Sequence, residues 1–337
     1  MEELHYIGVD VSKHTLDFAV YDGCLDLKDG HIQVGNDSKG FTTFARWIKG
    51  KGIEYDQVRL CMEFTGLYAH EFRCWLEQKD ITYYMIPPKK MHDFQVPTNI
   101  HGLGHVKTDR MDSYKIAIYS YKNSMDLQPS RLPSAAFFKL QRLMAERRQY
   151  VRQRQLYKFH THDIGAYESD ESRTRRKVMS KALLKSIQGV EQEIDNVISS
   201  DESIKKNYEL LTSIISIGRV CAITTIVLTE NFTAITNPRS YANYVCVAPY
   251  KKESGTSVRR KAMTSSEGVR QAKADLTIAA LSAIRWDPGT TSYWKRKKAE
   301  GKHSGVVLNA IKFKLIVRMF AVVKRARPYV KMHIFGK

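Results

Sequence analysis

The sequence lacks the features that would place a protein in a membrane or outside the cell. It has no apolar run near the roughly 18 residues that a membrane span requires, and no stretch with the composition of a secretory signal comes before the first predicted strand. Only five cysteines occur among 337 residues, and no two form a CxxC pair. Neither a disulfide framework nor a zinc ribbon is therefore indicated. We expect a cytoplasmic protein without a membrane partner.

Acidic residues are scarce beyond residue 130. Residues 1–130 contain 15 lysines and arginines against 18 aspartates and glutamates, a net charge of −3, whereas the remainder contains 39 against 17, a net charge of +22. A basic excess of this size attracts polyanions, because cationic side chains displace the counterions that surround them. The charge pattern favours nucleic acid as the partner.

The first 130 residues show the periodicity of an α/β domain. Alternating or continuous apolar patterns predict strands at 6–11, 15–20, 30–34, 58–62 and 81–86. Helical patterns cover 38–48, 67–78 and 110–121, with Ser38 as N-cap of the first and a loop rich in proline and glycine before the last. The order βββ-α-β-α-β-α is that of the ribonuclease-H-like (RuvC-like) fold, in which the first and fourth strands lie side by side.

Four carboxylates occupy the ends of these elements. Asp10 lies within a strand that is otherwise apolar, Glu63 ends the fourth strand, and Asp109 and Asp112 are three residues apart at the start of a helix. Carboxylates that converge repel one another unless hard cations lie between them. We therefore predict a site for Mg²⁺ or Mn²⁺, of the kind that supports phosphoryl transfer on polynucleotides.

Several cations near the acidic positions and in the middle of the chain are candidates for phosphate contact. Lys13 and Lys107 flank the acidic positions and can pair with a carboxylate or a phosphate. A polar stretch at 167–177 is predicted to be a loop that carries the basic run Arg173, Arg175, Arg176 and Lys177.

Residues 134–211 have the pattern of long, charged helices. Apolar side chains recur at intervals of three and four residues at Leu183, Ile187, Val190, Ile194 and Val197, and again at Ile204, Tyr208 and Leu211. This stripe fits a coiled-coil seam that joins subunits, and it fits equally well amphipathic helices that pack within one chain.

The last third of the chain begins near Leu210. Ile214 to Gly218 precede an apolar helix and resemble half of a helix-hairpin-helix. Ser254 and Gly255 follow as a turn surrounded by the cations Lys251, Lys252, Arg259, Arg260 and Lys261. Such a loop can grip phosphate, or its serine can act as a nucleophile. The lysines and arginines of the terminal stretch, Lys312 among them, are interpreted as the basic outer face of an amphipathic core helix, and contact with DNA or RNA is compatible with this interpretation.

In combination these motifs resemble the DEDD transposases of the insertion sequence 110 family, a group that includes Piv-type DNA invertases and bridge-RNA-guided recombinases. The resemblance covers nearly the whole chain. It is carried by Gly8 to Lys13, Met62 to Gly66 and Lys107 to Asp112 for the acidic positions, and by Ile214 to Gly218, Ala248-Pro249, Ser254-Gly255, Gly268-Val269-Arg270 and Asn309-Ala310. The chain departs from relatives at Ile215-Ser216, where they often have Pro-Gly, and at Cys246, where they often have glycine.

The resemblance implies three domains: a RuvC-like domain at 1–130, a helical coiled-coil linker at 131–209 and a mostly helical transposase domain at 210–337. By position the nucleophile is Ser254, with Ser257 as the alternative. The serine would form a covalent phosphoserine bond to DNA, without ATP, while a metal-bound tetrad stabilises the transferring phosphoryl group.

The family also implies several partners. Target and donor DNA would be double-stranded, and a noncoding bridge RNA would pair with both. Dimers would assemble into tetramers, and the protein would associate with the nucleoid when bound to DNA. Arg270 lies in a segment that carries the resemblance and is a further candidate for nucleic-acid contact.

Three other functions fit parts of the sequence. A plain metal-dependent nuclease or junction resolvase would use water as nucleophile. An actin-like kinase would share the segment Gly8 to Ser12, but we find no second glycine-rich phosphate loop at a suitable distance. A noncatalytic nucleic-acid-binding protein would keep the charge pattern without the chemistry.

Overall fold

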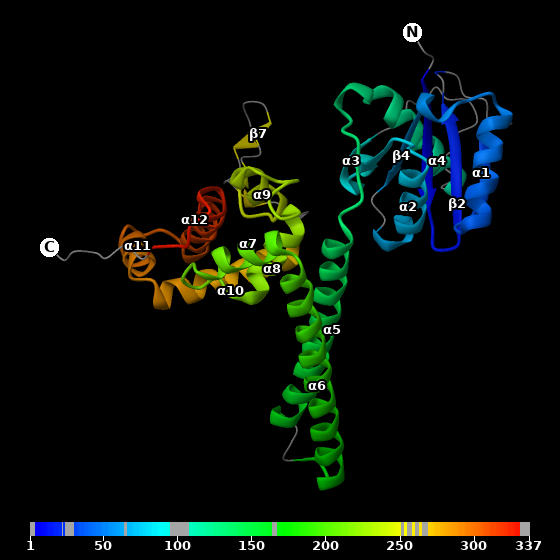
Figure 1. Ribbon diagram of the computed structural model, residues 1–337. Helices are drawn as coiled ribbons and strands as arrows, with labels where there is room; N and C mark the ends of the chain where they lie inside the picture. The colour runs from blue at the N-terminus through cyan, green and yellow to red at the C-terminus, as the bar shows by residue number, and fades with distance from the viewer. Residues whose placement is uncertain are drawn as a thin grey trace. The chain divides into compact units, whose positions relative to one another are not determined.

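The computed structural model describes residues 4–21, 23, 30–63, 66–94, 108–163, 167–250, 253–254, 258–259, 263–264 and 269–330. The chain divides into two compact units, Met1–Leu132 and Pro133–Lys337, which are described separately (Figure 1). The first is an α/β unit with a mixed sheet, and the second is mostly helical.

The first unit is built on one five-stranded sheet. Its strands are β1 (His5–Val11), β2 (Thr15–Tyr21), β3 (His31–Gly35), β4 (Val58–Glu63) and β5 (Tyr83–Ile86), in the spatial order β3-β2-β1-β4-β5. β4 is parallel to β1 and β5, while β2 is antiparallel to β1 and β3. The expectation that the first and fourth strands are neighbours is confirmed. Assignment to the ribonuclease-H-like fold itself stays a prediction.

Helices cover both faces of this sheet. They are α1 (Ser38–Gly50), α2 (His70–Gln78), α3 (Pro88–Asp93) and α4 (Asp109–Lys122). Ile7, Val9, Leu16 and Phe18 alternate along β1 and β2 and share one buried cluster with the aromatic residues of α1 and α2. Because side chains alternate along a strand, the opposite face of β1 is left for α4, which packs on β1, β2 and β4.

The structure corrects details of the predicted elements. The N-cap of α1 is Asp37 rather than Ser38, because the Asp37 carboxylate accepts a hydrogen bond from the Gly40 backbone at 2.8 Å. The predicted helix at 67–78 begins as a 3₁₀ turn, Gly66–Ala69, and becomes α-helical at His70. The helix α3 forms where the sequence indicated only a loop, since Pro88 occupies the first turn, where a missing N–H costs nothing.

The second unit consists of a long helical pair and a bundle of shorter helices. The helices are α5 (Ala135–Asp163), α6 (Asp170–Ser200), α7 (Glu202–Thr212), α8 (Arg219–Thr229), α9 (Pro238–Tyr244), α10 (Arg270–Trp286), α11 (Pro288–Ala299) and α12 (Ser304–Arg325). Two short ladders lie between α9 and α10: β6 (Pro249–Tyr250) with β9 (Met263–Thr264), and β7 (Glu253–Ser254) with β8 (Val258–Arg259). Figure 1 shows α5 and α6 running side by side as the longest elements.

The apolar stripe of the long helices is buried within this chain. Val190, Ile194 and Val197 of α6 belong to one core that also contains residues of α5, α8, α10 and α12. Ile204 and Leu211 continue that core in α7. Packing within one chain therefore accounts for the stripe, while a coiled-coil contact between subunits stays a prediction. The boundary expected near residue 210 also stays a prediction, because the core runs across it.

No helix in the ranges described here is both long and apolar enough to traverse a lipid bilayer. The described cysteines form no disulfide. Cys61, Cys221 and Cys246 are buried, and Cys74 is partly exposed. Cys24 lies outside the described residues.

Candidate functional site

The acidic site is built on the sheet face that α4 covers. A side chain at Gly8 would point at α4, since a Cβ there would lie 2.0 Å from the Ser113 carbonyl oxygen. Asp10 follows two residues later and therefore faces the same way. On β4 the register pairs Gly8 with Cys61, whose thiol donates to the Ser120 hydroxyl of α4 at 2.8 Å, so Glu63 also shares this face. Asp10 and Glu63 thus point to the same side at the carboxyl ends of two adjacent strands.

The helix α4 runs antiparallel to β1 and begins at the acidic end of the sheet. Tyr121, in its last turn, meets Tyr6 edge to face with 5.3 Å between the ring centroids, whereas Ser113 lies beside Gly8. Its first turn, with Asp109 and Asp112, consequently lies toward Asp10. Thr108 caps the helix by accepting a hydrogen bond from the Met111 backbone at 3.3 Å.

The charges of the other carboxylates affect the pKa of Asp10. Its pKa is raised from 3.8 to about 6, first by burial and then by the negative charges of Asp112, Asp109, Asp17 and Glu63. Within the described ranges, no three histidine, cysteine or acidic side chains are grouped closely enough to hold a metal ion. The structure thus brings the four predicted carboxylates into one electrostatic neighbourhood, but not to the short distances of a ligand shell.

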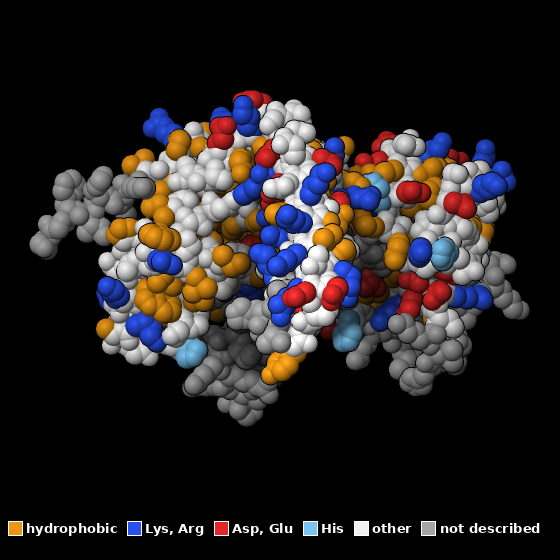
Figure 2. All heavy atoms as spheres, turned by 90° about the horizontal axis from the view of Figure 1, so that it is seen from below, with side chains coloured by type: hydrophobic (Ala, Val, Ile, Leu, Met, Phe, Trp, Pro, Cys, Tyr) orange, Lys and Arg blue, Asp and Glu red, His pale blue; other side chains and the backbone are white. Residues whose placement is uncertain are grey.

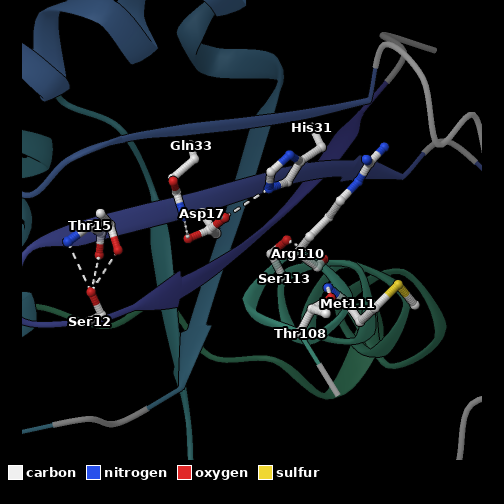
Figure 3. A network of polar contacts seen from close by, with 9 residues as sticks. All are labelled: Ser12, Thr15, Asp17, His31, Gln33, Thr108, Arg110, Met111 and Ser113. Carbon is white, nitrogen blue, oxygen red and sulfur yellow. Dashed lines mark hydrogen bonds and ion pairs between the residues drawn. The ribbon is translucent and has the colours of Figure 1, made fainter. Parts of the chain in front are cut away.

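A fifth carboxylate, Asp17, was not among the sequence candidates. It pairs with Asp10 across β1 and β2, and only 3% of it is exposed. His31 Nε2 lies 2.9 Å from one of its oxygens, and the Gln33 amide donates to the other at 3.0 Å (Figure 3). These partners hold Asp17 in place and compensate part of its burial. Alternation along β2 would have placed Asp17 on the α4 face, had the register with β1 been known.

The predicted cations around the acidic site are only partly described. Lys13 is exposed in the turn after β1, close in sequence to Asp10. Lys107 lies outside the described residues, one position before the Thr108 cap. Lys13 forms no ion pair with a carboxylate among the described residues.

The predicted serine lies in the second unit. Ser254 is the last residue of β7 and pairs with Val258 of β8 in an antiparallel ladder. Only the backbone of Ser254 and Arg259 is described. Several other predicted residues of this loop lie outside the described ranges, namely Ser257, Lys251, Lys252, Arg260 and Lys261. Arg270 is the first residue of α10.

The basic run predicted on a loop is helical. Arg173, Arg175, Arg176 and Lys177 lie in the first two turns of α6. Ser169 caps this helix by accepting from the Ser172 backbone at 3.3 Å, and Asp170 and Glu171 complement the helix dipole, which explains the early start. Figure 2 shows lysine and arginine side chains gathered over the end of the α5–α6 pair, with acidic side chains among them.

Part of this basic run is neutralised within the chain. Arg176 forms an ion pair with Glu168, and Arg173 forms one with Asp170 at 3.3 Å. Arg175 and Lys177 are exposed. These two side chains are consequently the members of the run that are most accessible to a polyanion.

Two models of transposase families match this chain. A model of the DEDD transposases of IS110, described as transposase, matches residues 7–163, and a model described as transposase of the IS116/IS110/IS902 family matches residues 208–295. The chain belongs to the IS110 family of transposases. The first IS110 model spans all four predicted carboxylates, and the second spans Ser254.

Two relatives are similar over nearly the full length of this chain, and a third over part of it. Pilin gene-inverting proteins of Moraxella lacunata and Moraxella bovis are each 24% identical to this IS110 transposase over 330 residues, covering 97% of the chain and 98% of the relative. An uncharacterised IS110 protein of Streptomyces coelicolor is 28% identical over 121 residues, which cover 36% of this chain and 29% of that protein. A role as a DNA recombinase or transposase follows from these similarities.

Ser216 and Cys246, at which the sequence departs from the family pattern it resembles, share an unusual backbone conformation. Ser216 has φ of 76° and Cys246 has φ of 57°, both in the left-handed region. Glycine adopts this conformation without strain, whereas residues with a Cβ do so at a cost of roughly 1–2 kcal/mol. The backbone conformation at both positions therefore favours glycine, although this chain has serine and cysteine there.

Proposed function

We propose that this protein cleaves and exchanges DNA strands through a covalent phosphoserine intermediate, with catalytic groups supplied by both units. The observation that carries the proposal is the convergence of Asp109, Asp112 and Glu63 toward Asp10. The pKa of Asp10 is raised to about 6, first by burial and then by the negative charges of these three carboxylates and of Asp17. A cluster of like charges is costly to a fold and is typical of sites that bind cations or transfer protons.

The residues present fit Mg²⁺ or Mn²⁺ by their chemistry. Both ions prefer carboxylate oxygens, and a cation among four carboxylates would remove the repulsion that Asp10 now experiences. Asp10, Glu63, Asp109 and Asp112 would hold the ion. When bound, it would supply positive charge that stabilises the transferring phosphoryl group and the leaving oxygen.

The serine step is a transesterification that requires no high-energy cofactor. The Ser254 hydroxyl oxygen attacks the phosphorus of a DNA phosphodiester and loses its proton, while the bond from phosphorus to one deoxyribose oxygen breaks and that oxygen takes up a proton. A hydroxyl end of another strand then attacks the phosphoserine and releases Ser254 again. The ester conserves the bond energy, which is why no ATP is required.

The second unit would supply most of the contacts with nucleic acid. The residues after 130 carry a net charge of +22, and the exposed Arg175 and Lys177 belong to this part. The proposal includes double-stranded target and donor DNA, a noncoding bridge RNA that pairs with both, and assembly of dimers into tetramers. Contacts to backbone phosphates would position these polymers, and base pairing with the RNA would select the sequence.

The nucleophile is tested by trapping the protein on DNA. Nucleic acid that copurifies with the full chain is sequenced first, and labelled DNA of that sequence is then incubated with the protein and Mg²⁺ before denaturation. We expect a covalent adduct with the wild type, none with Ser254→Ala, and unchanged DNA affinity of that variant by fluorescence anisotropy. Ser257→Ala is the matched control and should keep both adduct and affinity.

Two outcomes would contradict the proposal. Adducts at normal yield in Ser254→Ala would exclude this nucleophile. Metal-dependent cleavage without any adduct, in the wild type and both variants, would instead identify a nuclease or resolvase that uses water.

A further inference from the structure

Lys312 is buried in the second unit although it carries a positive charge. Only 6% of it is exposed, and among the residues that the structure describes no acceptor is found for its ammonium group. Burial, followed by the nearby charge of Lys273, lowers its pKa. The sequence pattern placed Lys312 on the outer face of its helix, and this prediction is wrong. Burying a charge is costly unless it is paired, and an anion bound beside Lys312 would pair it.

Lys312 lines a pocket between three helices. The pocket has a volume of about 920 Å³ and is bordered by α9, α10 and α12 together with the segment that leads into β6. Arg239 of α9 and Lys273 of α10 line it with Lys312, so three helices each contribute a cation. Its described lining contains no acidic side chain.

The rest of the pocket lining is largely apolar. Val247, Val306 and Phe313 form part of this surface. Asn309 belongs to the lining too, and its amide donates to the Val247 carbonyl, which ties α12 to the segment before β6. A ligand that fits this lining combines an anionic group with an apolar body.

We propose that this pocket binds one unpaired nucleotide of a nucleic-acid strand, with the phosphate beside Lys312 and the base against the apolar wall. An unstacked base exposes apolar ring faces that pack on side chains such as Phe313. The phosphate of the same nucleotide provides a negative charge that pairs with the Lys312 ammonium group. The choice of a strand rather than a free nucleotide rests on the proposed function. Pro249 lines the pocket and Ser254 follows five residues later, so the bound nucleotide would lie near the predicted serine loop along the chain.

The test measures binding by the full chain and does not depend on cleavage. Fluorescence anisotropy compares a labelled 12-nucleotide single strand, as DNA and as RNA, with the duplex of the same sequence. Lys312→Met should weaken single-strand binding about tenfold and reduce the slope of log affinity against log salt by about 0.7. Its melting temperature should stay equal or rise, because a buried unpaired charge is removed.

Two further variants make the result specific. Lys324→Met removes the same charge from an exposed position near the end of α12 and should change affinity less than twofold. Val306→Trp keeps every charge but fills the pocket from a position that is 63% exposed, so it should fold normally and weaken single-strand binding as Lys312→Met does. A loss confined to DNA or to RNA would support the pocket and identify the strand.

Three results would overturn the proposal. Wild-type affinity and salt slope in both Lys312→Met and Val306→Trp would show that the pocket takes no nucleotide. An equal loss of duplex binding would exclude an unpaired nucleotide. Displacement of the strand by a free mononucleotide at equal concentration would show that the ligand is not a strand. Loss of adducts in Ser254→Ala is measured separately, so the proposed function and this pocket can fail independently.

Discussion

Asp10 is the residue whose environment is most unusual for its type. It lies on a strand between apolar neighbours, and four other carboxylates act on it. Its pKa of about 6 means that the fold favours the protonated form, relative to an ordinary value of 3.8. Because the folded pKa is raised, ionisation of Asp10 destabilises the protein as pH rises from about 4 to about 6, and the full penalty remains at higher pH.

We predict that Asp10→Asn stabilises the metal-free protein by about 1 kcal/mol near pH 7.5, a value reduced from the pKa shift for partial solvent screening. Thermal unfolding is the measurement. The gain should vanish below about pH 4, where the wild-type carboxyl is protonated in both the folded and the unfolded state. Mg²⁺ should raise the melting temperature of the wild type and have little effect on Asp10→Asn. Lower stability of the variant at neutral pH would indicate that Asp10 has a purely structural role.

Ser216 is strained for a different reason. It adopts a left-handed conformation, and its hydroxyl is buried without a hydrogen-bond partner among the described residues. Ser216→Gly should therefore stabilise the second unit by about 1–2 kcal/mol, as measured by chemical denaturation. Ser213 provides the control, because its hydroxyl donates to the Leu210 carbonyl and accepts from the Tyr329 backbone. Ser213→Gly should destabilise, and a destabilising Ser216→Gly would contradict the strain argument.

Among the elements, α4 determines the geometry of the acidic site. It lies so close to β1 that only glycine fits at position 8: an added Cβ would meet the Ser113 carbonyl at 2.0 Å and the Ala117 nitrogen at 2.3 Å. Both contacts are to backbone atoms, which cannot rotate away. The close approach brings the first turn of α4, with Asp109 and Asp112, over the end of β1.

We predict that Gly8→Ala displaces α4 and destabilises the first unit by about 3 kcal/mol or more. Gly189 is the matched control, since it lies inside α6 and an added Cβ meets nothing within 4 Å. Gly189→Ala should instead stabilise its helix by about 0.5–1 kcal/mol. Both values can be read from urea unfolding followed by circular dichroism. An unchanged Gly8→Ala protein would show that the helix can shift without cost.

At the scale of the whole molecule, two separate cores support the two halves of the proposed chemistry. Ile48 is fully buried in the core of the first unit and Ile194 in that of the second. The acidic positions depend on the first core, and the serine loop and the nucleotide pocket depend on the second.

Calorimetry of the full chain should consequently show two transitions. Ile48→Ala should lower the midpoint temperature of one transition and Ile194→Ala that of the other. Each decrease should correspond to a loss of about 2–5 kcal/mol in stability, the cost of truncating a fully buried isoleucine. A single transition that both variants lower equally would mean that the units unfold cooperatively.

The sequence by itself determined the elements and the identity of most candidate residues. Periodicity of apolar residues predicted all five strands of the sheet within one or two residues at most ends, and the isolated Asp10 in an apolar strand indicated a candidate site, because such information is local. The tertiary structure decided what depends on distant segments meeting: that Asp17 joins Asp10 across two strands, and that Lys312 faces a pocket rather than solvent. The physical reason is that burial and electrostatic coupling arise from contacts between segments, whereas strand and helix propensities arise within them.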